Sequence, residues 1–384
     1  MRAVELLAST PRSRILLCAI GSEEQPIIVK ALKLTDEATA VRAAREISIA
    51  AQAMPFTVAS SGWFCSGPEV YMTLEFQPGG DVDLLIDREG ALSPQAARFY
   101  TGCAALALEV LHEQSIVHRD VKPDNLCIGH DGYAKVADLG YARTLAAGER
   151  AATLVGTPEY LAPEVFLGEG SDARSDMWSL GTSLYVMLLA SHPYGGSSPQ
   201  ELYHRVLNEP LFFPSNHFTF SEPAKALLSA CISRDAAIRP TAAGVWELDF
   251  FAKALPPTMT VPALDKESLL KKMVTPPFVP RLGGPFDTRY FAKVDGSDSD
   301  VDENELEEGE AGGSGCGNQK ARLRYIAVEQ PGGDTVGAAS STGPAIEAAR
   351  LEAALRLAKG AADPSRYSQA PCNAADLIRS PGQF

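Results

Sequence analysis

The feature that most constrains this chain is the eight-residue run from His118 to Asn125, which reads HRDVKPDN. Three more motifs follow it: DLG at 138–140, GTPEY at 156–160 and APE at 162–164. An aspartate or asparagine standing alone in such a run is usually a turn residue or a helix cap. Here four motifs occur together in one chain and in a fixed order, which argues instead for one shared function.

In this order and spacing, the motifs resemble the catalytic loop, the metal-binding turn and the end of the activation segment of a protein kinase. The resemblance implies an α+β, two-lobed protein kinase fold: a catalytic domain over 1–251, with a small β-rich N-lobe (1–77) and a large helical C-lobe (78–251). It also implies ATP and Mg²⁺ as cofactors, because kinases transfer the γ-phosphoryl group of magnesium-bound ATP.

Four residues of these motifs are the expected catalytic residues: Asp120, Lys122, Asn125 and Asp138. Phosphoryl transfer needs positioning and charge neutralisation more than covalent chemistry. We expect Asp120 to accept or orient the proton of a substrate hydroxyl, and Lys122 to lie beside the transferred phosphoryl group. Asn125 and Asp138 offer the oxygen ligands that magnesium prefers. The lysine two residues after Asp120 resembles serine/threonine kinases rather than tyrosine kinases.

Composition limits the other classes of function. The net charge of −14 argues against general nucleic-acid binding, which needs a basic surface. Much of this charge is local, since 9 of the 16 residues over 295–310 are acidic and none is basic. The seven cysteines show no zinc spacing and favour a reducing compartment. With no apolar run of about 18 residues, no signal-peptide pattern and Arg2 instead of a myristoylation glycine, we expect a soluble intracellular protein, cytoplasmic or nuclear, without a membrane span.

The N-terminal residues 4–34 contain two short apolar runs separated by a turn, which predict two strands. By the resemblance, a lysine near the end of the second run holds the α- and β-phosphates of ATP. Lys30 is favoured by its distance to the next helix, and Lys33 is the alternative because Ala31 precedes it by two residues. The helix is expected over 37–53, with Glu46 as the partner of the lysine.

The expected phosphate-covering loop departs from the family. A kinase uses a GxGxxG hairpin whose bare backbone approaches the phosphates closely. Here Ala8, Thr10 and Ser13 stand in the glycine positions, Pro11 removes a backbone donor, and Ile28 stands where a small alanine usually covers the adenine. A pseudokinase or nucleotide-binding scaffold is therefore the alternative function. An imperfect N-terminus that hides the true loop is a further alternative.

The resemblance also implies a set of adenosine contacts. Leu74 is the expected gatekeeper, and the backbone of Glu75 and Gln77 is expected to bond the adenine. Cys127 would form the floor of the site and Asp81 would lie near the ribose. The full predicted nucleotide set is Lys30, Glu46, Leu7, Ile15, Leu74, Glu75, Gln77, Asp81, Cys127 and Phe291.

Three longer stretches, ARFYTGCAALALEVLHE, HDGYAKVADLGYAR and ATLVGTPEYLAPE, resemble AGC kinases, and among them the cAMP- and cGMP-dependent protein kinases. The resemblance implies a phosphorylated Thr153 paired with Arg119 and Arg143. It further implies that Thr157 contacts the catalytic loop. Three residues have implied structural roles: Asp176 braces the catalytic loop, and Glu164 forms a buried ion pair with Arg239.

Substrates and partners follow from the same resemblance. Asp81, Asp124 and Glu159 favour peptides with basic residues before the acceptor Ser or Thr, while Val186 replaces one acid of the relatives and weakens the preference two positions before it. Leu154, Pro158 and Leu161 would form an apolar pocket for the residue after the acceptor. An upstream activating kinase and a regulatory subunit are possible partners.

Two tail segments complete the predicted organisation. Residues 252–294 resemble the AGC C-terminal tail, because PPF-P at 276–280 is followed by Asp287-Thr288-Arg289-Tyr290-Phe291. The later FxxF motif of that tail is absent from the sequence. Residues 295–384 are acidic and then rich in Gly and Ala, which predicts a mostly disordered tail.

Overall fold

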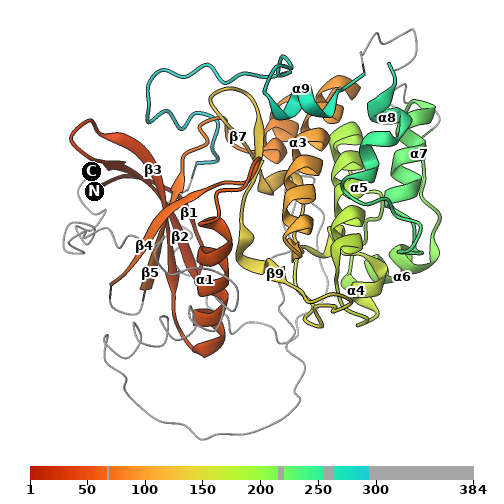
Figure 1. The fold of residues 1–384 in the computed structure, drawn as a ribbon, viewed down its shortest axis with the longest axis horizontal. Coiled ribbons are helices and arrows are strands. Elements are labelled where there is room, and N and C mark those ends of the chain that lie inside the picture. Colours follow the sequence, from red (N-terminus) through yellow and green to blue (C-terminus); the bar gives the residue numbers. More distant parts are fainter. Residues whose placement is uncertain (67–68, 215–219, 255–262, 294–384) are drawn as a thin grey trace, which may run out of the picture.

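The computed structural model describes residues 1–66, 69–214, 220–254 and 263–293. The predicted acidic and Gly/Ala-rich tail lies outside these ranges. The described chain has two lobes, a β-sheet with one helix and a larger helical part, as Figure 1 shows. The predicted two-lobed α+β fold is therefore confirmed.

The N-lobe is a five-stranded antiparallel sheet in the order β1-β2-β3-β5-β4. The strand bounds are Arg2–Ser9 (β1), Ser13–Ile20 (β2), Gln25–Lys33 (β3), Ser60–Ser66 (β4) and Glu69–Glu75 (β5). The sequence reading of two strands before residue 35 was wrong, because β1 is a third. β1 lies at the sheet edge and only Leu7 is buried in it, so its sequence lacks the alternation that marks a half-buried strand.

Helix α1 (Glu37–Ala50) packs its buried face, which includes Ala44 and Ile47, against the sheet residues Val70 and Met72. The Asp36 side chain accepts a hydrogen bond from the backbone N–H of Thr39 at 2.8 Å, and this capping box sets the start of the helix. The helix ends three residues before the predicted Ala53, which has a left-handed φ of 49°. Its position brings Glu46 to the inner side of the lobe.

The C-lobe is built around α3 and α5, whose Tyr100 and Trp178 are almost fully buried in the main core. Its longer helices are Val82–Glu89 (α2), Pro94–Glu113 (α3), Ala173–Leu189 (α5), Pro199–Asn208 (α6) and Glu222–Cys231 (α7). The shorter ones are Pro163–Phe166 (α4), Asp249–Ala252 (α8) and Lys266–Leu270 (α9).

Short strands lie where the lobes meet. Ile116–Val117 (β6) pairs with Arg143–Thr144 (β9), and Leu126–Ile128 (β7) pairs with Ala134–Val136 (β8). The predicted catalytic loop lies between β6 and β7, and the DLG turn follows β8. Two backbone pairings therefore position both motifs at the junction of the lobes.

The segment after α9 runs from the helical lobe back towards the sheet (Figure 1). It is anchored where Tyr133 donates its hydroxyl to the backbone oxygen of Val274, and its Thr288 hydroxyl donates to Glu5 of β1 at 2.8 Å. Phe286 and Phe291 pack against the sheet residues Leu7, Leu17 and Ile28. Among the described residues, no helix combines the length and the apolar character needed to cross a membrane.

Candidate active site

The centre of the site is a chain of charges that joins both lobes. The Nζ of Lys30 in β3 lies 2.5 Å from Oε1 of Glu46 in α1 and 2.7 Å from Oδ1 of Asp138 in the DLG turn. Lys30 is 9% exposed, whereas Lys33 is exposed at the end of the same strand. Lys30 is thus the lysine that meets the predicted glutamate.

The electrostatics of this triad favour the charged forms of Lys30 and Asp138. Burial alone would lower the pKa of Lys30, but the charges of Asp138 and Glu46 raise it above its usual value. Burial alone would raise the pKa of Asp138, but the charge and hydrogen bond of Lys30 hold it below its usual range. For Glu46 burial prevails and raises the pKa. The lysine is therefore a fixed cation at the lobe junction.

The catalytic loop carries a second cluster. Oδ1 of Asp120 accepts hydrogen bonds from the backbone N–H and the hydroxyl of Thr157, both at 2.8 Å. Lys122 donates to the same hydroxyl at 2.7 Å. Asn125 donates its side-chain N–H to the backbone oxygen of Asp120 at 2.8 Å. The structure thus brings together all the residues that the sequence predicted for this loop.

Backbone strain marks both motifs. Arg119 and Asp138 have left-handed φ values of 71° and 54°, which non-glycine residues seldom adopt. The buried carboxylate of Asp176 in α5 holds the first of these, since it accepts the backbone N–H groups of His118 and Arg119, both at 2.8 Å. Burial alone would raise the pKa of Asp176, but the hydrogen bond and charge of His112 lower it. Asp176 lies where its predicted bracing role requires.

The donor set fits a magnesium ion. Because the amide N–H of Asn125 bonds Asp120, its amide oxygen is the atom that can face a cation, and Asp138 adds a carboxylate with its pKa held low. Magnesium is commonly bound by one or two such oxygens plus water and phosphate. No cluster of three or more His, Cys, Asp or Glu suited to a metal occurs in the described part of the chain. These two residues would therefore need nucleotide and water to complete the shell.

The predicted adenosine side is apolar. Leu7, Ile15, Leu74 and Phe291 belong to one cluster on the inner face of the sheet together with Ile28, which is 9% exposed. The ring of Phe291 stacks on Phe76 with centroids 5.7 Å apart.

The other four predicted adenosine contacts are Cys127, Asp81, Gln77 and Glu75, between the end of β5 and β7. Burial raises the pKa of Cys127, which favours its neutral thiol form. Asp81 accepts the backbone N–H of Leu84 as the cap of α2. Gln77 is buried, and the side chain of Glu75 accepts from Lys135 at 2.7 Å.

The predicted phosphorylation site is next to one of its two predicted arginines. Nη1 of Arg119 donates to the hydroxyl of Thr153 at 2.8 Å. Arg143 instead pairs with Glu149 at 2.7 Å. Burial, followed by the charge of Arg143, lowers the pKa of Arg119 to about 10, and Arg143 also acts on Arg45 of α1. Sequence reasoning missed Arg45, although its place directly before Glu46 could have suggested it.

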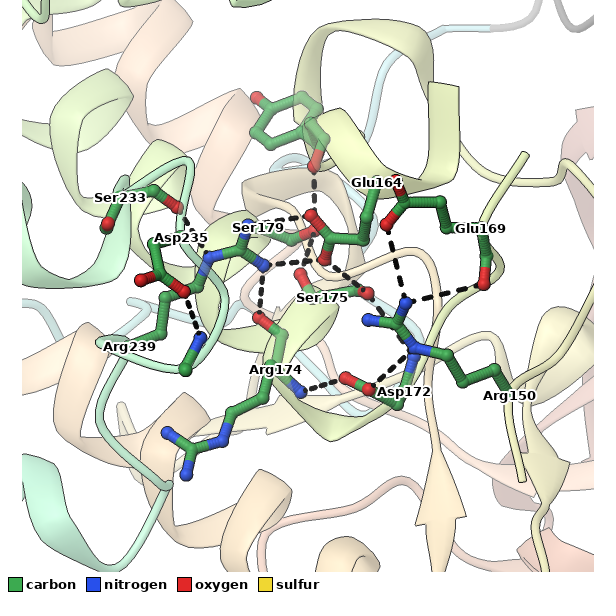
Figure 2. Close-up of polar contacts among 12 residues, drawn as sticks. Arg150, Glu164, Glu169, Asp172, Arg174, Ser175, Ser179, Ser233, Asp235 and Arg239 are labelled. Carbon is green, nitrogen blue, oxygen red and sulfur yellow. Dashed lines mark hydrogen bonds and ion pairs between the residues drawn. The ribbon is translucent and has the colours of Figure 1, made fainter. Parts of the chain in front are cut away.

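The end of the activation segment is anchored by a buried ion pair, drawn in Figure 2. The carboxylate of Glu164 in α4 accepts hydrogen bonds from both terminal nitrogens of Arg239, at 2.6 and 2.7 Å. It also accepts one from the hydroxyl of Ser175 at 2.8 Å. Arg239 also donates to the backbone oxygens of Arg174 and Ser233. The Nε, Nη1 and Nη2 atoms of Arg239 therefore each donate to an oxygen acceptor.

Two of the three predicted substrate acids, Asp124 and Glu159, act on the hydroxyl of Tyr160. Burial raises the pKa of its hydroxyl, and so do the charges of Asp124, Asp83, Glu159 and Asp120 in that order. Asp83 was not predicted, and its only sequence signal is its position two residues after Asp81. Of the predicted apolar pocket, Leu161 is buried and Leu154 is partly buried against the core.

The two-lobed fold, with the charge triad and the catalytic loop at the lobe junction, defines a phosphotransferase. Residues 11–251 match the protein kinase domain family, and the chain belongs to this family. It is 34% identical over 241 residues to serine/threonine-protein kinase gad8 of Schizosaccharomyces pombe, covering 62% of this chain and 40% of that protein. The serine/threonine-protein kinase YPK1 of Saccharomyces cerevisiae is also 34% identical over 241 residues, covering 62% of this chain and 34% of that protein.

A third relative is the RAC family serine/threonine-protein kinase homolog of Dictyostelium discoideum, which is 32% identical over 242 residues and covers 62% of this chain and 52% of that protein. The chain thus spans about a third to a half of the length of these relatives. The relatives confirm the resemblance to AGC serine/threonine kinases. The finer resemblance to the cAMP- and cGMP-dependent branch stays a prediction.

Proposed function

We propose that this chain is an ATP- and magnesium-dependent serine/threonine protein kinase of the AGC class. The observation that carries the proposal is the Lys30 contact with both Glu46 and Asp138, because it joins the N-lobe to the predicted metal turn. Family membership and the relatives' names support the same activity.

In this mechanism each residue has a defined task. Lys30 holds the α- and β-phosphates, and Glu46 keeps its ammonium in place. Asn125 and Asp138 would hold a magnesium ion, which would supply positive charge against the phosphates. Asp120 orients the substrate hydroxyl, since its carboxylate is already fixed by Thr157.

The pseudokinase alternative has no support in this geometry. A scaffold does not need the lysine, the two metal-side residues and the catalytic aspartate in contact distance of their partners, yet all four are so placed. The departures from the family concern the phosphate loop and Ile28, which carry neither an ion nor a transferred proton.

The first test is phosphate transfer from magnesium-ATP to an Arg-Arg-Ala-Ser peptide. We expect turnover that Asp138→Asn lowers by at least about a hundredfold, because charge stabilisation of this kind is worth that much. Asp87→Asn, an exposed aspartate of α2, is the matched control and should leave turnover unchanged. Replacing the arginine three positions before the serine with alanine should raise KM, as Asp81, Asp124 and Glu159 imply. Nucleotide binding with no turnover in any form would contradict the proposed enzyme.

We further propose that phosphorylation of Thr153 activates the kinase, by an upstream kinase that stays unidentified. A phosphate adds up to about two negative charges and strong acceptors. Arg119 already contacts the hydroxyl, and the neighbouring charges of Arg143 and Arg45 favour an anion there.

Phosphorylation of Thr153 is expected to raise kcat/KM by about tenfold, the size of effect that one new charge-assisted contact of about 1.4 kcal/mol produces. The measurement compares chain treated with an activating kinase and chain treated with phosphatase, with the phosphosite read by mass spectrometry. Thr153→Ala should abolish the difference, whereas Thr144→Ala, an exposed threonine of β9, should retain it. Equal stimulation of Thr153→Ala would show that another site is responsible.

A further inference from the structure

The turn between β1 and β2, residues Thr10 to Ser13, lies where kinases cover the nucleotide phosphates. The role inferred below for this glycine-free turn rests on the proposed function. The family hairpin works because backbone N–H groups point at the phosphates, and an anion held by several such groups needs no side chain. The strength of phosphate binding by such a turn therefore depends on how many of its backbone N–H groups are free to donate.

A side chain occupies those groups here. The Thr10 hydroxyl oxygen accepts the backbone N–H of Ser13 at 3.0 Å and that of Arg12 at 3.3 Å. The backbone N–H of Thr10 donates to the backbone oxygen of Ser13 at 2.8 Å. Pro11 has no N–H to donate. Each peptide N–H from Thr10 to Ser13 is thus either engaged within the turn or absent.

The turn is also closed by its hydroxyls. The Thr10 and Ser13 hydroxyl oxygens lie 2.9 Å apart, and the backbone oxygen of Arg12 accepts the N–H of Lys33 at 3.0 Å. This pattern is a threonine-capped turn, in which the side-chain oxygen takes the place of an external acceptor. A glycine at position 10 has no such oxygen.

Arg14, the first cation after the turn, does not replace the amides. Arg14 uses its guanidinium on both carboxylate oxygens of Glu69, at 2.9 and 2.7 Å, and Glu69 also accepts the hydroxyl of Tyr71. Ile15, the next residue of β2, lies in the opposite, adenosine-side cluster. By the alternation of a strand, Arg14 therefore lies on the outer face of the sheet.

We propose that Thr10 determines how strongly this site recognises the phosphates of its nucleotide. Its hydroxyl satisfies the amides that would otherwise bind phosphate oxygens, so the backbone of the turn contributes little to phosphate recognition. The binding energy comes from the apolar adenosine side, Lys30 and the magnesium-binding residues. The wild-type chain therefore discriminates only weakly between ATP and ADP, and removal of the hydroxyl increases the discrimination.

The test measures nucleotide affinity directly, by calorimetry with adenosine, ADP and ATP in the presence of Mg²⁺. Thr10→Gly is expected to strengthen ATP binding by about tenfold, because the released amides gain hydrogen bonds to a charged acceptor. Adenosine affinity should not change. Thr10→Ser keeps the hydroxyl and should behave as wild type. Ser9→Gly adds a glycine beside the turn without removing the cap and is the matched control for backbone freedom.

A second measurement follows the amides themselves by hydrogen exchange. In the wild type the Arg12 and Ser13 amides should be protected equally with and without ATP. In Thr10→Gly they should exchange faster without nucleotide and become protected by ATP.

The inference is overturned if Thr10→Gly binds ATP as the wild type does, or if Ser9→Gly gives the same gain. If Lys30→Met abolishes ATP binding while Thr10→Gly has no effect, the inference fails and the proposed kinase stands. If neither the wild type nor Thr10→Gly binds any nucleotide, both fail.

Discussion

Replacement of Lys30 with methionine is expected to lower kcat/KM for phosphotransfer by at least about a hundredfold, the size of loss that follows removal of one preorganised charge from a transition state. Lys30 contacts Glu46 and Asp138 at 2.5 and 2.7 Å. Its removal takes away the cation that we propose to hold the phosphates, and it leaves Glu46, 3% exposed, without the lysine of this ion pair. Steady-state kinetics on the same peptide provide the measurement.

Lys33→Met is the matched control, because it makes the same chemical change three residues along the same strand. Lys33 is exposed and should leave kcat/KM within about twofold, as surface substitutions usually do. A large loss in Lys33→Met together with near-normal activity in Lys30→Met would reverse the assignment. Circular dichroism of both variants separates a catalytic loss from misfolding.

Replacement of Arg239 with methionine is expected to lower the free energy of unfolding by about 3–5 kcal/mol, the usual cost of breaking a buried ion pair. The change leaves the Glu164 carboxylate buried, with Ser175 as its remaining side-chain donor among the contacts described above. It also removes the guanidinium that lies 5.2 Å from the ring centre of Trp178. The measurement is the urea unfolding curve, with the m-value checked for a change in the unfolding transition.

Two comparisons make this expectation specific. Lys253→Met breaks the exposed pair with Asp249 in α8 and should cost no more than about 0.5 kcal/mol. The double variant Glu164→Met/Arg239→Met should recover part of the loss, because no unpaired charge then remains buried. A small loss in Arg239→Met, comparable with Lys253→Met, would show that the buried pair does not contribute to stability as proposed.

The motif residues were predictable because their geometry is local. Asp120, Lys122 and Asn125 lie within six residues of one another, and their spacing already fixes them in one loop. The capping box of α1 was not predicted, although Asp36 and Thr39 carry its signal. The partner Glu46 required the resemblance as well, since many glutamates occur on helix surfaces.

The choice between Lys30 and Lys33 illustrates the limit of a sequence reading. Side chains alternate along a strand, so two lysines three residues apart lie on opposite faces of the sheet. The sequence contains both lysines but does not show which face α1 covers. The register of β3 between β2 and β5 settles this and directs Lys30 to the helix.

The sequence by itself determined the family, the two-lobed fold, the catalytic loop and the DLG turn, because those features depend on residue types at short spacing. Only the tertiary structure brought the charge of Arg143 to act on Arg45, brought the charges of acids that include Asp83 to raise the pKa of Tyr160, and revealed β1 at the sheet edge. It also showed that the Thr10 hydroxyl occupies the turn amides. These features depend on distances between segments and on hydrogen-bond directions, and neither is specified until the chain packs.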